Sequence, residues 1–174
     1  MRVLLDTNVV LDVLLDREPF AFGARRLWAA IEAGRAEGCL AAHALTTVHY
    51  LVSQARGARE ARDVIGLLMR VFEVAPVDGV VARRALQLDF ADFEDAVSAA
   101  AAEAFGCGLV ATRNTKHFKA SPVTAVDPLS AAAALEPGPE GVSEATPAYG
   151  KASPRARSKA SAPRRRARAR SSPH

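Results

Sequence analysis

Three short segments of the sequence carry carboxylate and amide side chains of the kind that hold a metal ion. The first segment follows an apolar run at the N-terminus, the second precedes an alanine-rich run, and the third follows another apolar run. The residues are Asp6 and Asn8, then Asp92, Glu94 and Asp95, and then Asn114 with Arg113 beside it. Mg²⁺ and Mn²⁺ prefer hard oxygen ligands of this type. A fold that brings the segments together would form a divalent-metal site.

The first segment lies where a buried strand is expected to end. Residues 3–5 form an uninterrupted apolar run, which is typical of a strand buried on both faces of a sheet. Open α/β sheets place their sites beyond the carboxyl ends of such strands. Asp and Asn are also favoured in turns, so Asp6 and Asn8 can equally shape the connection from the strand to a helix. The residues alone leave both interpretations open.

The second and third segments follow elements that can reach the same place. Asp92 and Asp95 have the spacing of an N-cap and the third position of the helix expected over residues 93–105, so both can simply cap it. Asn114 follows the strand expected over residues 108–112. In a parallel sheet this strand and the N-terminal strand end at one edge, and a helix start can lie beside them. We therefore expect the three segments to meet.

The elements that position these residues follow from apolar runs and from the Gly and Pro residues that interrupt them. Strands are expected over residues 3–5, 39–42, 72–75, 108–112 and 123–126, and helices over residues 21–33, 45–54, 58–71, 80–88, 93–105 and 128–135. Strands that alternate with helices indicate a parallel sheet with helices on both faces. The predicted fold is α/β, a three-layer α/β/α sandwich with a mostly parallel central sheet.

The composition indicates one globular domain and a basic tail. The chain has 174 residues and is 49% hydrophobic, which suits a single domain with a full core. Residues 136–174 contain nine Lys or Arg and three Glu. Subtracting these from the totals of 23 basic and 19 acidic residues leaves 14 basic and 16 acidic residues. The predicted domain, residues 1–135, is therefore slightly acidic, and the tail supplies the whole positive excess.

The tail, residues 136–174, is rich in Pro, Ala, Ser and Arg and poor in large apolar residues. Such a segment cannot bury enough surface to offset its ordering entropy, so we expect it to be disordered. Its arginine cluster over residues 164–170 can bind phosphates by releasing counterions. A solvated extension without a specific function is an equally open interpretation.

The remaining composition predicts a cytoplasmic protein. No apolar run is long enough to span a bilayer, so no membrane association is expected. A single Arg2 before a short apolar run is not typical of a signal peptide. Cys39 and Cys107 stand alone in apolar surroundings, which suggests reduced thiols in the core and no disulfide framework.

Four segments together resemble one known family. They read LLDTNVVLDVLLDREPF, HALTTVHYLV, DFADFEDAV and LVATRNTKHF in the order of the chain. The combination is similar to PIN domains, and within them to the bacterial PIN-like ribonucleases that include the VapC-type toxins of toxin–antitoxin pairs. The resemblance covers nearly all of residues 1–130 and leaves the basic tail outside.

The resemblance implies an endoribonuclease that uses Mg²⁺ or Mn²⁺ to hydrolyse RNA phosphodiester bonds. Asp6 matches the family's N-terminal catalytic acid, and Asp95 matches the acid that opens the later helix, so both are expected to be catalytic and to bind the metal. Asn8 matches a polar position that supports the first acid. The implied partners are RNA, an antitoxin protein and a second copy of the chain in a homodimer.

The sequence departs from the family pattern at three positions. The helix after the second strand offers Thr46 or Thr47 where the family often has an acid, and Asn114 replaces an acid after the fourth strand. His117 stands where many relatives have another Asp. Asp6 and Asp95 remain as the two carboxylates that match the family pattern, and Asp92 and Glu94 are further candidates. The alternative function is therefore a catalytically weak or inactive PIN-like module that binds RNA or protein, the latter through the apolar helices of residues 45–71.

The other polar residues near these motifs have simpler expectations. His43 and His49 are expected to pack or lie at the surface, and His117 is a candidate contact to substrate. Arg113 can hold a phosphate or cover the sheet edge in solvent. Three acids are expected in a solvated loop or helix end: Asp12, Asp16 and Glu18.

Overall fold

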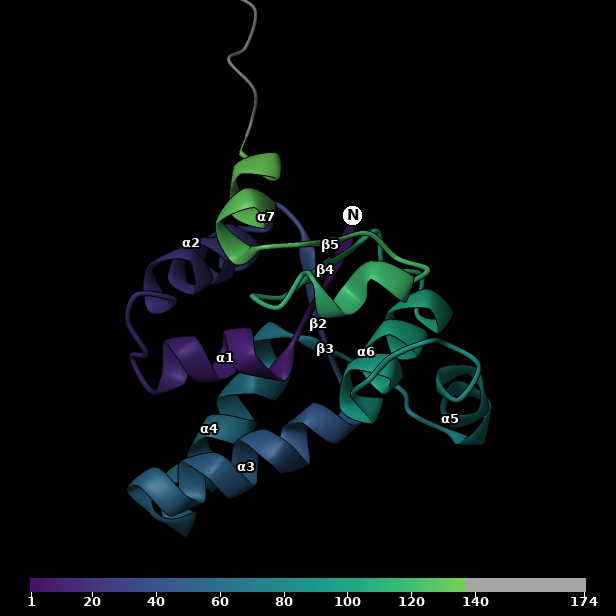
Figure 1. Ribbon diagram of the computed structural model, residues 1–174. Coiled ribbons are helices and arrows are strands. Elements are labelled where there is room, and N and C mark those ends of the chain that lie inside the picture. The colour runs from purple at the N-terminus through teal and green to yellow at the C-terminus, as the bar shows by residue number, and fades with distance from the viewer. Residues whose placement is uncertain (137–174) are drawn as a thin grey trace, which may run out of the picture. The chain divides into compact units, whose positions relative to one another are not determined.

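The computed structural model describes residues 1–136, and within them five parallel strands form one central sheet (Figure 1). The strands are β1 (Arg2–Leu5), β2 (Glu37–Ala41), β3 (Glu73–Ala75), β4 (Leu109–Ala111) and β5 (Ala125–Val126). Their order across the sheet is β3-β2-β1-β4-β5. Apart from its first residue, the tail predicted to be disordered lies outside the described residues.

Helices cover both faces of the sheet. They are α1 (Thr7–Leu14), α2 (Ala21–Glu32), α3 (Ala42–Arg56), α4 (Ala58–Val71), α5 (Gly79–Ala85), α6 (Phe93–Ala104) and α7 (Pro128–Ala134), with a 3₁₀ turn over His117–Ala120. Side chains from α1, α2, α3, α4 and α7 share one core with Val3 and Leu5. Side chains from α5, α6 and the 3₁₀ turn share a second core with Leu4. This arrangement confirms the predicted three-layer fold.

β1 is the centre of the sheet, and its position fixes the edge where polar residues gather. It pairs with β2 on one side and with β4 on the other, and Val3, Leu4 and Leu5 are completely or almost completely buried. Alternate side chains of a strand point to opposite faces, so this one apolar run supplies both cores. The register pairs Leu5 with Ala111, so β1 and β4 end side by side.

The structure differs from the predicted elements mainly after β1 and β2. α1 begins at Thr7, directly after the strand, although no helix was predicted there. β2 ends at Ala41 because α3 begins at Ala42, three residues earlier than expected. Both strands therefore pass into helices without a loop. Such tight connections bring helix starts to the carboxyl edge of the sheet.

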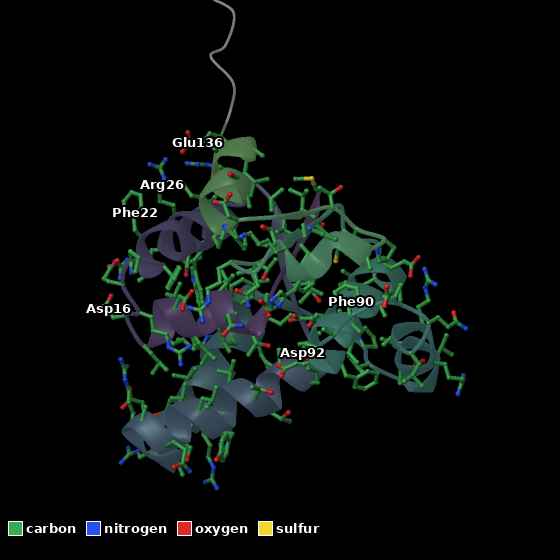
Figure 2. The ribbon with its side chains drawn as sticks, in the orientation of Figure 1. Asp16, Phe22, Arg26, Phe90, Asp92 and Glu136 are labelled. Atoms are coloured by element: carbon green, nitrogen blue, oxygen red, sulfur yellow. The ribbon has the colours of Figure 1, made fainter. Side chains whose placement is uncertain are left out.

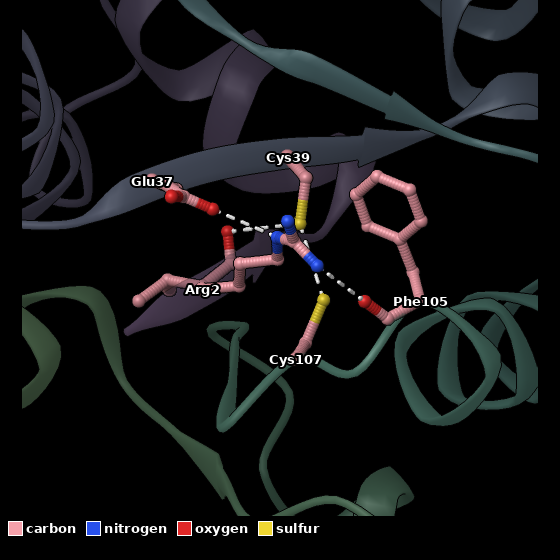
Figure 3. Close-up of polar contacts among 6 residues, drawn as sticks. Arg2, Glu37, Cys39, Phe105 and Cys107 are labelled. Atoms are coloured by element: carbon pink, nitrogen blue, oxygen red, sulfur yellow. Dashed lines mark hydrogen bonds and ion pairs between the residues drawn. The ribbon is translucent and has the colours of Figure 1, made fainter.

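The two cysteines, far apart in sequence, lie together in the core, as Figure 3 shows. Both are buried and free, and their Sγ atoms are 3.2 Å apart. Arg2 lies beside them, where it donates to Glu37 at 2.8 Å and to the carbonyl of Phe105. The hydrogen bond with Cys107, together with burial, raises the pKa of the Cys39 thiol. Cys39 therefore stays protonated, as expected of a core thiol.

Among residues 1–136 there is no helix with the length and apolar character needed to cross a bilayer.

Gly38 lies where the second strand passes closest to the helices, which predicts a steric effect of substitution. A Cβ on Gly38 would lie 2.7 Å from Phe72 Cδ1 and 2.8 Å from Ile31 Cγ2, both in the core. Gly38→Ala should lower the free energy of unfolding by about 1–3 kcal/mol, as overpacking of a core does. Urea denaturation of the two proteins measures this difference.

A matched control is available in α4. A Cβ on Gly66 meets only Arg70 Nη1, at 3.9 Å. Gly66→Ala should therefore leave stability unchanged or raise it by roughly 0.5–1 kcal/mol, because alanine is the better helix former. If the two substitutions changed the free energy of unfolding equally, the close contacts predicted for a Cβ at Gly38 would not be destabilising.

Candidate metal centre

Asp6 is held at the junction of the two central strands. Its backbone N–H donates to the carbonyl of Ala111 at 2.9 Å, which continues the pairing of β1 with β4. The hydroxyl of Thr112 donates to Asp6 Oδ2 at 2.8 Å. Asp6 is only 4% exposed. A backbone bond and a side-chain bond thus fix the carboxylate at the carboxyl edge of the sheet.

The turn-forming role considered for Asp6 does not account for its side chain. Asp6 occupies the N-cap position of α1, yet its carboxylate makes no capping hydrogen bond. The side chain is instead bonded to Thr112, from the neighbouring strand end. A buried carboxylate that neither caps a helix nor pairs with a cation is typical of a functional group.

Asp92 and Asp95 are close in sequence but have different roles at the start of α6. Asp92 is the N-cap and accepts from the backbone N–H of Glu94 at 2.8 Å. Asp95 is 8% exposed, and its Oδ2 lies 3.3 Å from Nδ1 of His117 in the 3₁₀ turn. Glu94 accepts from the hydroxyl of Thr7 at 3.2 Å. Capping therefore explains Asp92, but not Asp95.

The predicted site residues face one cleft of about 240 Å³. Those that line it are Asp6, Asn8, Thr47, Asp92, Glu94, Asp95 and Asn114, joined by Thr7, Leu11, Leu51 and His117. Arg113 is the one predicted site residue outside this lining. At the position where an acid was expected, Thr47 lines the cleft, whereas Thr46 donates its hydroxyl to the carbonyl of His43 at 2.7 Å. Figure 2 shows Asp92 at the start of α6.

Burial and like charges oppose ionisation of the two buried acids of the cleft, Asp6 and Asp95. Burial raises the pKa of Asp6, and the charge of Glu94 adds to the effect, while the hydrogen bond from Thr112 and the nearby polar groups of Asn8 oppose it. Burial also raises the pKa of Asp95, followed by repulsion from Asp6 and Asp92, and the contact with His117 opposes it. A cation in the cleft would relieve both the repulsion and the desolvation.

The donor set suits a hard cation that keeps much of its water. Within the described part of the chain, no three acidic, His or Cys side chains converge on one point as a closed metal site would require. Mg²⁺ is commonly held by one or two carboxylates, with waters and substrate phosphates as its other ligands. Asp6 and Asp95 are the two buried acids of the cleft, with Asn8 and Asn114 as neutral oxygen donors. These residues fit such an ion.

Arg113 belongs to a second buried group beside the cleft. Its guanidinium donates to Asp12 Oδ1 at 2.9 Å and to Asn8 Oδ1 at 3.3 Å, and lies 4.7 Å from the ring centre of Phe20. The prediction that Asp12 is solvated was wrong, because its carboxylate is completely buried on α1. Arg113 pairs with this carboxylate. The alternative prediction, that Arg113 covers the sheet edge in solvent, was therefore wrong.

Sequence reasoning missed two residues of the site, Asp12 and Thr112. Asp12 stands four residues after Asn8 and therefore shares its face of α1. This spacing would have pointed to Asp12 if a helix had been predicted over these residues. Burial raises the pKa of Asp12, and the charges of Arg113 and Arg17 oppose this. Thr112 carries no signal of its own, because it matters only through its contact with a residue 106 positions away.

The other residues considered in the sequence, His43, Asp16 and Glu18, do not line the cleft. His43 packs in α3, where its Nε2 lies 3.4 Å from the hydroxyl of Ser98, and burial lowers its pKa. Asp16 and Glu18 are exposed, as predicted, and both pair with Arg25.

Comparison with known proteins adds a family to this geometry. A family model described as PIN domain matches residues 2–116. The fold is similar to VapBC2 from Rickettsia felis bound to a fragment of promoter DNA, at 15% identity and a TM-score of 0.58, covering 73% of this chain and 98% of that one. No curated protein matches the chain.

Two further solved structures share the fold. FitAcB from Neisseria gonorrhoeae is 22% identical with a TM-score of 0.57, over 72% of this chain and 97% of that one. VapC20 from Mycobacterium tuberculosis, described as a toxin that cleaves the sarcin–ricin loop, is 21% identical with a TM-score of 0.51, over 62% and 86%. At these identities the likeness establishes the fold alone.

The raised pKa of Asp6 predicts how stability depends on pH without metal. As pH rises above about 3.8, the unfolded chain releases this proton before the folded protein does, so stability falls until pH passes the folded pKa. Asp6→Asn removes this fall. In EDTA it should raise the free energy of unfolding at pH 7, and the gain should shrink near pH 4. Urea denaturation at both pH values measures it.

The exposed Asp63→Asn on α4 serves as the control and should change stability by less than about 0.5 kcal/mol at either pH. A loss of stability for Asp6→Asn that is equal at both pH values would contradict the account. It would mean that the bond to Thr112 outweighs the cost of burying the charge.

The pair of Arg113 and Asp12 predicts a rescue experiment. Arg113→Met leaves the buried Asp12 without its cation and should lower the free energy of unfolding by about 3 kcal/mol. Adding Asp12→Asn removes the stranded charge, so the double variant should be more stable than Arg113→Met alone. Thermal and urea unfolding compare the three proteins. A double variant that is no more stable than the single one would contradict this role of the pair.

Proposed function

The chain belongs to the PIN domain family, and we propose that it is a metal-dependent endoribonuclease, the toxin of a toxin–antitoxin pair. The observation that carries the proposal is the pairing of Asp6 and Asp95 in one cleft. Both acids are buried and have a raised pKa, and among residues 1–136 neither pairs with Arg or Lys. Folding keeps this unfavourable arrangement, which is expected where acids serve a function.

In this proposal Asp6 and Asp95 would hold Mg²⁺ or Mn²⁺, and Asn8, Asn114, Asp92 and Glu94 would support the site from the wall of the cleft. The bound ion would supply a water of lowered pKa and would neutralise charge on the scissile phosphate. The four residues Asp6, Asp95, Asn8 and Asn114 support this assignment because each offers a hard oxygen atom to the cleft.

The chain's own residues would orient the reacting groups. The hydrogen bond from Thr112 holds Asp6 Oδ2 in place, and the contact with His117 holds Asp95 Oδ2. Arg113 anchors Asn8, whose side chain lines the cleft. Groups held in place before substrate arrives do not need to be ordered during the reaction.

RNA as the substrate, an antitoxin as the partner, a homodimer and a cytoplasmic location are parts of the same proposal. Among the similar structures, one from Klebsiella pneumoniae is described as a toxin–antitoxin complex, and VapC20 is described as a toxin that cleaves the sarcin–ricin loop. Exposed apolar side chains on α3 and α4, including Tyr50 and Met69, offer surface for a protein partner.

A catalytically weak or inactive RNA-binding module is the second candidate. It is favoured by Thr47 and Asn114, neutral residues that line the cleft where the family often has acids. Fewer carboxylates give weaker metal binding, because ligand charge contributes to affinity.

RNA cleavage with Mn²⁺ tests the leading proposal. The wild-type chain should cleave single-stranded RNA, and Asp6→Ala or Asp95→Ala should reduce the rate at least about a hundredfold. Even mutation of residues that only orient a metal ligand typically reduces activity by about 10–100-fold. Asp63→Asn, on the exposed face of α4, should keep full activity. Cleavage that is absent, or that survives Asp6→Ala unchanged, would overturn the proposal.

One further variant distinguishes a weak enzyme from a binding module. Asn114→Asp adds a carboxylate to the cleft and should raise the cleavage rate at limiting Mn²⁺. RNA binding that is independent of metal and survives loss of both acids, without cleavage by any variant, would favour the binding module.

A further inference from the structure

A second hollow, of about 260 Å³, lies beside the cleft and is lined by aromatic and apolar groups. Its lining comes from the segment that enters α2, from the start of α7 and from Arg113. Phe20 is 47% exposed and Phe22 is 56% exposed, and Figure 2 shows Phe22 directed away from α2. Exposed aromatic rings that line a hollow mark a binding surface.

Close packing of α2 against α7 forms the base of the hollow. A Cβ on Gly23 would lie 3.3 Å from the backbone N of Leu129, so glycine permits this approach. The hollow is smaller than the pockets of roughly 300–1,000 Å³ that hold drug-sized ligands. It suits one flat ring system better than a helix or a folded peptide.

Arg113 joins the hollow to the candidate metal centre. It lines the hollow, its guanidinium lies over the ring of Phe20, and it donates to Asn8 in the wall of the cleft. The ion pair with Asp12 fixes it there. The hollow therefore has aromatic rings and a fixed guanidinium whose charge is paired with Asp12, and nucleobases stack on both kinds of group.

The position of the hollow also agrees with the path of a nucleic-acid strand. Asp127 and Pro128 line it and directly follow β5, while Arg113 follows β4. The cleft lies at the ends of β1 and β4, so the hollow is displaced along the same edge by one or two strand spacings, roughly 5–10 Å. A strand with a phosphate in the cleft would pass over it.

We propose that this hollow binds one unpaired base of an RNA strand whose neighbouring phosphate lies in the cleft, by stacking on Phe22 and Phe20 beside Arg113. The inference rests on the proposed function, because it takes the ligand of the cleft to be RNA. Stacking accepts any base, so the hollow holds the strand in position and requires that the RNA be single-stranded there.

The test compares strands with and without bases. The probes are a fluorescein-labelled single-stranded oligo(A) of eight nucleotides and the matching abasic strand, with affinity measured by fluorescence anisotropy. Every protein is the full chain carrying Asp6→Asn, so that the strands are not cleaved. The proteins are this background and the same background with Phe22→Ala, Phe22→Leu or Leu86→Ala. Leu86 is a control because it is 74% exposed at the end of α5 and lines neither cavity.

The background protein should prefer the strand with bases. Stacking of one base contributes about 1–3 kcal/mol, or roughly 5–150-fold in affinity. Phe22→Ala should reduce the preference by at least about fivefold without changing affinity for the abasic strand. Phe22→Leu should do the same, because leucine keeps apolar area but has no ring face. Leu86→Ala should keep the full preference. Circular dichroism checks that each variant is folded.

Three results would overturn the proposal. The first is that both Phe22 variants keep the full preference for the strand with bases over the abasic strand. The second is that the background protein binds the two strands equally well. The third is that the sole effect of Phe22→Ala is the loss of a co-purifying protein or of dimerisation. Wild-type cleavage with Mn²⁺ separates the two proposals. A chain that cleaves RNA without this preference refutes the hollow alone, and a chain with the preference but no cleavage refutes the enzyme alone.

Discussion

The candidate site depends on one constraint, the burial of the Asp6 carboxylate where the central strand ends. The backbone of Asp6 is bonded to Ala111 and its side chain to Thr112, so the acid cannot turn away into solvent. Asp95 and Glu94 are then brought within reach of its charge by the start of α6. The fold thus concentrates like charges that, without a cation, oppose one another.

Two neighbouring acid groups show how the same chain treats a buried charge with and without a partner. Asp12 and Asp6 are both buried, but Asp12 has Arg113 as a counter-ion at 2.9 Å. Among the described residues, the side chain that donates to the Asp6 carboxylate is the neutral Thr112. The difference is what separates a structural ion pair from a site that can accept an added cation. Arg113 also anchors Asn8 and stacks on Phe20, so it connects the metal centre to the aromatic hollow.

The sequence allowed the fold and the meeting of the polar segments in one cleft to be predicted, because both depend on local patterns. Alternation of apolar runs with helical segments predicts a parallel sheet, and a parallel sheet places Asp6 and Asn114 at one edge. Contacts between distant residues were out of reach. Asp12 and Arg113 are 101 positions apart, and Cys39 and Cys107 are 68 apart, so no periodicity reports their pairing. α1 was missed because it follows β1 without the loop that usually marks a boundary.

The central claim is that Asp6 and Asp95 together hold a divalent cation. Anomalous diffraction from crystals of the protein soaked in MnCl₂ tests it most directly. The account predicts a manganese peak in the cleft, in direct contact with a carboxylate oxygen of each acid, at about the 2.0–2.1 Å known for Mg²⁺ or slightly longer. A peak bound to other residues, or an empty cleft at saturating Mn²⁺, would contradict it.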